Sequence, residues 1–144
     1  MVHPRQEPTF LPLTVGVARS AAGEQDDPER RRLADAVCRR AEEAESAATG
    51  CWAALLGGCE SAERRGLPAR LRALAEATTG YVGEPWWFGH GSVHRRRVAE
   101  AQLRINDAVR EGDGAEFAEA FVGYDQAIAT AVVSVRSKLE SPTP

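Results

Sequence analysis

The residues that could carry chemistry gather in the segment 81–97. His90 and His94 stand four residues apart there, and Arg95 and Arg97 follow them directly. Three bulky aromatic residues precede the histidines: Trp86, Trp87 and Phe88. Arginines and the free N–H groups at a helix start both bind phosphate or carboxylate groups, and aromatic rings anchor protein partners. These seven residues are therefore the candidates for binding a ligand or a partner.

Two interpretations of this segment stay open. In one, the aromatic residues plug the open end of a helical bundle, and the arginines pair with acidic residues on a solvated surface. In the other, the aromatic residues form an exposed recognition surface, and the arginines form an anion pocket at the helix start. Both interpretations hold together if one tryptophan is buried while its neighbour faces outward.

Cysteines add few further possibilities. Cys51 and Cys59, together with His90 and His94, supply the residue types of a zinc site. On one helix, however, the two cysteines would lie about 12 Å apart, which is too far to share an ion. A cysteine beside a histidine would be the candidate pair for nucleophilic catalysis, but nothing in the sequence brings the two together. We therefore expect no metal, no cofactor and no catalytic residue, with the thiols packed as small hydrophobes.

The common signatures of catalysis are absent from the sequence. It has no P-loop, no dinucleotide-binding glycine pattern, no His-Glu-x-x-His and no Cys-x-x-Cys. The Glu-x-x-His pairs of a ferritin-like di-iron centre are absent too, since Trp87 and Gly91 stand three residues before the two histidines. The chain is therefore more typical of a binding protein than of an enzyme.

The charge balance and the cysteine content limit which partners and which cellular compartment the sequence predicts. The 144 residues include 18 basic and 21 acidic side chains, and this balance does not predict binding to nucleic acid or to an anionic membrane. No apolar run approaches the roughly 18 residues of a membrane span, and Pro12 interrupts the one candidate for a signal peptide. Three cysteines, an odd number, argue against a secreted disulfide scaffold. We expect a cytoplasmic protein.

Residues 1–27 are predicted to form a flexible or extended N-terminal arm. The arm ends in a polar run, and its composition is too poor in large apolar residues to form a core alone. Leu11, Leu13, Val15 and Val17 alternate with smaller or polar residues, so the arm could lie extended across the body or across a partner. A floppy tail is the alternative.

A long helix is predicted over residues 28–65. Asp27 caps its start, and Pro28 takes its first position. Small and apolar residues recur along one face: Leu33, Val37, Ala41, Ala44, Ala48, Cys51, Leu55, Cys59 and Ala62. Because this stripe keeps its phase through the interior glycines, we favour one continuous helix, with a break at Gly50 as the alternative.

A short helix and a loop follow. Gly66 suits the end of the long helix, and Pro68 suits the first turn of a helix over residues 68–79. Residues 80–91 hold four glycines, a proline and four of the nine aromatic residues of the chain. This composition predicts an aromatic loop.

Two longer helices complete the chain. The first is capped by Ser92 and stops at Gly112, and the second opens at Asp113, as in a capping box, and ends near Ser141. The second has a core-facing stripe: Phe117, Phe121, Tyr124, Ile128, Val132, Val135 and Leu139. The predicted fold class is all-α: a bundle of about four helices in one domain, 28–141, with the last two helices as an antiparallel pair.

The long helix also predicts assembly. It would span roughly 57 Å, against roughly 40 Å for the last helix, so its small-residue stripe would stay partly uncovered. We therefore predict a homodimer through this stripe.

The function is predicted only in outline. The missing catalytic signatures, the stripe, the arm and the Trp-Trp-Phe loop favour a non-enzymatic cytoplasmic protein that acts through protein contacts, as an adaptor or accessory subunit. A protein partner would dock on the arm or on the loop. The alternative is a protein, an enzyme included, that binds a small molecule or an anion in a pocket formed by segment 81–97.

Overall fold

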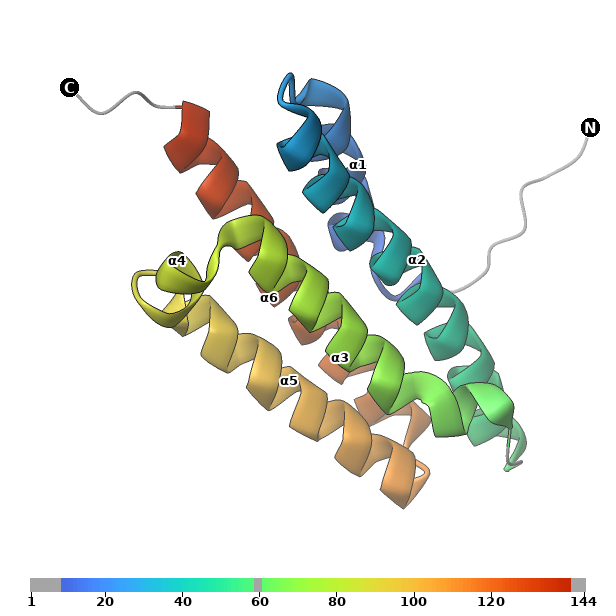
Figure 1. The fold of residues 1–144 in the computed structure, drawn as a ribbon. Coiled ribbons are helices and arrows are strands. Elements are labelled where there is room, and N and C mark those ends of the chain that lie inside the picture. Colours follow the sequence, from blue (N-terminus) through green and yellow to red (C-terminus); the bar gives the residue numbers. More distant parts are fainter. Residues whose placement is uncertain (1–8, 59–60, 141–144) are drawn as a thin grey trace, which may run out of the picture.

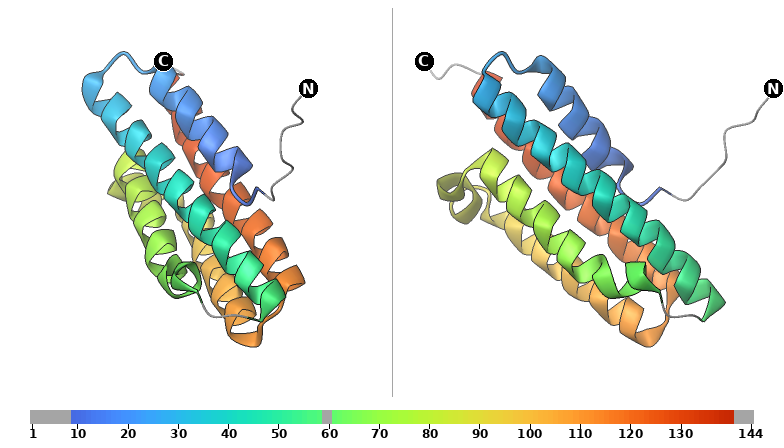
Figure 2. Two further views of the ribbon diagram at one scale, coloured as in Figure 1. Left: turned by 90° about the vertical axis from the view of Figure 1, so that its right-hand side faces the viewer. Right: turned by 45° about the vertical axis from the view of Figure 1, so that its right-hand side comes forward.

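The all-α prediction is confirmed by a computed structural model that describes residues 9–58 and 61–140, with side chains as far as residue 135. The described residues form six helices and no strand. Their bounds are α1 Pro12–Glu24, α2 Pro28–Gly57, α3 Ala62–Val82, α4 Glu84–Phe88, α5 Ser92–Glu111 and α6 Gly114–Glu140. The helices α2, α3, α5 and α6 run along the length of the molecule, α1 lies on α2 and α6, and α4 closes one end (Figures 1 and 2).

The prediction of an extended arm is wrong over Pro12–Glu24, which form α1. Pro12 occupies the first turn of this helix, where its missing N–H is not needed. The buried residues of α1 follow helical spacing: Thr14, Ala18, Ala21 and Ala22. The alternation of aliphatic residues led to the wrong prediction, because the fully buried residues of α1 are small, while Val15 and Val17 are only partly buried and Leu13 is exposed. Residues 1–8 of the predicted arm lie outside the described residues.

The continuous helix is confirmed through Gly50, but its predicted end at residue 65 is wrong. The helix α2 ends at Gly57, and Gly58 takes a left-handed conformation with φ of 68°. Gly50 lies inside α2, and a Cβ atom at this position would lie only 2.6 Å from Cγ of Glu63. The glycine therefore allows the start of α3 to approach α2 closely, and it does not mark a helix end.

The helix α3 is longer than the predicted 68–79. Ser61 caps its start, since the Ser61 hydroxyl accepts a hydrogen bond from the Arg64 N–H at 3.0 Å. Pro68 lies inside the helix and not at its first turn. One proline removes one helical hydrogen bond. The burial of neighbouring leucines keeps the helix continuous across it: Leu67, Leu71 and Leu74.

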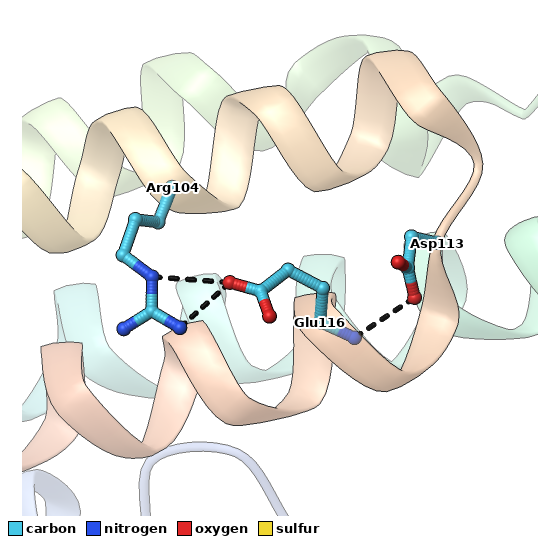
Figure 3. Close-up of polar contacts among 3 residues, drawn as sticks. All are labelled: Arg104, Asp113 and Glu116. Carbon is cyan, nitrogen blue, oxygen red and sulfur yellow. Dashed lines mark hydrogen bonds and ion pairs between the residues drawn. The ribbon is translucent and has the colours of Figure 1, made fainter.

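The last two predicted helices are confirmed, with small differences at their ends. Ser92 is the first residue of α5 and does not cap it. Asp113 does cap α6, since its carboxylate accepts from the Glu116 N–H at 3.0 Å. In place of the reciprocal bond of a capping box, the Glu116 carboxylate accepts from Arg104 of α5, at 2.6 Å from Nη2 (Figure 3). The turn between α5 and α6 is thus joined by a cap and an ion pair.

The core contains most residues of both predicted stripes, but Leu33 is only half-buried, and Ala62, the first residue of α3, is exposed. The stripe of α6 is buried from Phe117 to Val135, as far as side chains are described. The alanines of the α2 stripe are also buried within the chain, because α1, α3 and α6 all pack on α2. A homodimer therefore cannot use this stripe while α1 stays in place. Within the described residues, the helices are all too short or too polar to cross a bilayer.

Candidate functional site

The predicted aromatic loop is mostly helical. The helix α3 continues to Val82, and Gly83, with φ of 90°, turns the chain into α4. Two further glycines are required at the end of α4. A Cβ at Gly89 would lie 2.7 Å from the Pro85 carbonyl oxygen, and one at Gly91 would lie 2.4 Å from the Trp86 ring. The tight turns hold the aromatic residues of α4 against the start of α5 at one end of the molecule (Figure 1).

The three aromatic residues of α4 have different environments. Trp87 is 4% exposed and belongs to the hydrophobic core, as the plug interpretation predicts. Trp86 is half-buried, and its ring stacks on the His94 ring at a centroid distance of 5.8 Å. Phe88 is 64% exposed. One tryptophan therefore anchors α4 in the core, while the phenylalanine that follows it faces outward.

The position of His94 makes it an uncharged ring. Burial lowers the pKa of His94, and the positive charge of Arg97 lowers it further. The imidazole is therefore neutral at neutral pH. Its Nδ1 atom is buried and has no hydrogen-bond partner among the described residues. His94 thus supports the position of Trp86 by stacking, and it retains one unused polar atom.

Arg95 connects the start of α5 to the exposed ring of Phe88. The Arg95 guanidinium carbon lies 4.9 Å from the centroid of the Phe88 ring, a cation–π contact. The Nε atom of Arg95 is buried and makes no hydrogen bond to the described residues. Phe88 and Arg95 therefore form a pair fixed on two helices. We call this pair, with the exposed side chains of Arg96 and Arg97, the Phe88 surface.

The remaining predicted site residue, His90, is exposed in the turn between α4 and α5. The described interactions do not link it to Trp86 or His94. No group of three or more possible metal ligands occurs among the described residues. Cys59 lies outside the described residues, and burial raises the pKa of Cys51 to about 11. A thiol with so high a pKa is a poor nucleophile.

Two hollows of the described surface include residues close in sequence to the aromatic cluster. One, of about 510 Å³, lies between α5 and α6 and includes Arg97 in its lining. Another, of about 410 Å³, lies at the end of α3 and includes Gly83 and Glu84. Neither is lined by a tryptophan, a phenylalanine or a histidine.

A second polar site was not predicted from the sequence. The carboxylates of Glu45 on α2 and Asp125 on α6 both bind backbone N–H groups at the start of α1. Asp125 is only 3% exposed. Two signals could have revealed it. Asp125 falls on the core-facing side of α6, and Leu11, which precedes Pro12, has no side-chain acceptor to cap α1.

Comparisons with known proteins do not identify the chain: no family model, no curated protein and no solved structure matches it. Its function must therefore be inferred from the two sites themselves.

Proposed function

We propose that the protein is a non-enzymatic interaction protein that binds an acidic protein partner through the Phe88 surface. The observation that carries this proposal is the exposure of the Phe88 ring, 64%, on a helix whose other aromatic residues are fixed. The exposed ring buries little apolar surface in the monomer, where it contacts Arg95, whereas aromatic and arginine side chains are the usual anchors of protein interfaces.

The rigidity of α4 supports a binding role for Phe88. Trp87 is seated in the core next to it, and Trp86 packs against Gly91 and His94. The ring is therefore held before a partner arrives, so little side-chain entropy is lost on binding.

The charge around Phe88 supports an acidic partner. Arg95, Arg96 and Arg97 lie in the first turns of α5, where the positive end of the helix dipole adds to their charge. No acidic residue occurs in the first turn of α5. A carboxylate of a partner would accept hydrogen bonds from an arginine guanidinium there, next to the apolar ring of Phe88.

Affinity capture from the native host tests the proposal with three baits: the wild type, Phe88→Ala and Leu103→Ala. Leu103 is the matched control, because it is equally exposed, 65%, on α5. We expect an acidic partner that is depleted at least about tenfold with Phe88→Ala and retained with Leu103→Ala. Equal capture by all three folded baits, or capture of no partner, would contradict the proposal.

Self-association and a cytoplasmic location belong to the same proposal. The odd number of cysteines supports the location. Because the small-residue stripe of α2 is buried within the chain, a homodimer needs another surface. Light scattering at micromolar concentration tests for it, and a strict monomer at all concentrations would refute it.

A second candidate, an anion-binding protein, is favoured by one observation. His94 Nδ1 and Arg95 Nε are both buried at the start of α5 and lack partners among the described residues. A phosphate or carboxylate oxygen would satisfy such donors at a helix start. Titration with inorganic phosphate should then change the tryptophan fluorescence, and Arg95→Ala should abolish the change. An unchanged spectrum would leave only the protein-binding proposal.

A further inference from the structure

Two neighbouring helices, α1 and α6, share a surface without exposed charge. In a chain with 27% charged residues, residues 9–18 contain no charged side chain, and residues 120–135 contain only Asp125. Asp125 is buried, and its carboxylate accepts from the N–H groups of Leu13 and Thr14 in α1. These hydrogen bonds hold the two uncharged segments side by side (Figure 2).

Exposed apolar side chains project from both uncharged segments. Leu13 of α1 is 49% exposed, and Val122 and Val133 of α6 are 56% and 43% exposed. The two valines are separated by about three helical turns, so they lie on the same side of α6. This side faces solvent, whereas the large residues of the core-facing stripe of α6 are buried.

Helix geometry places these apolar residues next to one another. On α6, Val122 lies one turn before Asp125, the residue that binds the start of α1. On α1, Arg19 faces α2 because it pairs with Glu42, and Leu13 lies about 120° around the helix from Arg19, beside α6. The apolar residues of the two helices therefore form one surface. We call it the uncharged strip: Leu13, Val17, Val122, Gln126 and Val133.

An uncharged surface is suited to pairing with itself. In a two-fold dimer the same surface of both copies meets, so an exposed charge near the axis would face a like charge. The Phe88 surface is unsuited to such pairing, because Arg95, Arg96 and Arg97 would repel their counterparts. The uncharged strip has no such repulsion. A charged partner, in contrast, would lose the hydration of its charges against the strip and gain no counter-charge.

We propose that the uncharged strip packs against the uncharged strip of a second copy, so that the chain forms a two-fold homodimer through α1 and α6. Each copy keeps its own α1 in place, and the dimer buries the exposed side chains of Leu13, Val122 and Val133. Apolar residues and a lack of charge are typical of homodimer interfaces. This inference rests on the self-association proposed above, and it is independent of the Phe88 surface.

Light scattering from micromolar to millimolar concentration tests the strip on the full chain. The wild type is compared with Val122→Glu, Val133→Glu and Leu103→Glu. Leu103 is the matched control, because it is 65% exposed on α5, outside the strip. All three side chains are exposed, so each variant should fold, as circular dichroism will verify. For either valine variant we expect an at least about 100-fold higher dissociation constant, because the symmetry brings two added carboxylates to the interface. The control should dimerise like the wild type.

The possible results separate this proposal from the broader one. A wild type that stays monomeric would refute both self-association and the role of the strip. A wild-type dimer that persists in both valine variants would overturn only the role of the strip. Affinity capture with Val122→Glu as bait gives a third result. Specific loss of another protein from this bait would show that a different partner covers the strip, and it would also overturn the proposal.

Chemical shifts locate the dimer interface directly. On dilution of the wild type, the amide signals of Leu13, Val122 and Val133 should shift, because these residues leave the interface. The signals of Phe88 and Leu103 should stay constant. Dilution shifts confined to any other surface would overturn the proposal.

Discussion

Removal of the Asp125 carboxylate is the most direct test of how α1 is held. Asp125 is 3% exposed, and its two oxygens accept from the N–H groups of Leu13 and Thr14. In Asp125→Ala both N–H groups lose their acceptor. If α1 stays docked, each unpaired N–H costs about 1–3 kcal/mol, so we expect the two to lower the free energy of unfolding by about 2–6 kcal/mol.

The loss of unfolding free energy in Asp125→Ala has an upper limit. If α1 separates from α2 and α6 instead, the two N–H groups bind water, and the loss cannot exceed the free energy that held α1 in place. Asp125→Asn should have a smaller effect, because the amide keeps one acceptor oxygen. Its NH₂ group faces the second N–H and cannot accept a hydrogen bond from it. A loss smaller than about 2 kcal/mol together with exposure of α1 would therefore indicate undocking without global unfolding.

Urea unfolding followed by circular dichroism measures these losses, with Asp113→Ala as the control. Asp113 also accepts from one backbone N–H at a helix start, but the hydrogen bond is exposed. Loss of such a cap costs about 1 kcal/mol. We expect the order Asp125→Ala, Asp125→Asn, Asp113→Ala from largest to smallest loss. If Asp125→Ala loses no more stability than Asp113→Ala, the Asp125 carboxylate does not hold α1 in place.

Three further predictions concern single residues. Trp87→Ala should lower the free energy of unfolding by about 3–5 kcal/mol in urea, and Phe88→Ala should hardly change it, since only Trp87 is buried. Equal losses would refute the assignment of Trp87 as the buried anchor and Phe88 as the exposed residue. Gly91→Ala should cost about 1–3 kcal/mol, because its Cβ would overlap the Trp86 ring and displace it, and unchanged stability would contradict this packing. Burial raises the pKa of Glu45 above its usual 4.5. The folded state therefore binds this proton more tightly than the unfolded state, and stability from this group falls as pH rises through the folded pKa. The stability of the wild type relative to Glu45→Gln should be greater at about pH 4 than at pH 7, and a constant difference would refute the shift.

The helices of the second half of the chain were predictable because their signals are local. The stripe from Phe117 to Val135 fixes the buried side of α6, and Asp113 marks its start. The break between α2 and α3 was not predictable from the same signals. Gly50 and Gly58 are both glycines within one apolar stripe, and only the approach of Glu63 makes the first an interior position.

The residues of the candidate site were predictable from the sequence, but the role of each residue was not. The sequence places two tryptophans next to a phenylalanine, and periodicity cannot decide which of them is buried. That depends on α4, a helix of five residues that periodicity is too weak to detect. The polar site at the start of α1 was missed for a different reason: Glu45 and Asp125 are 80 residues apart in the sequence. They come together only through the packing of α2, α6 and α1.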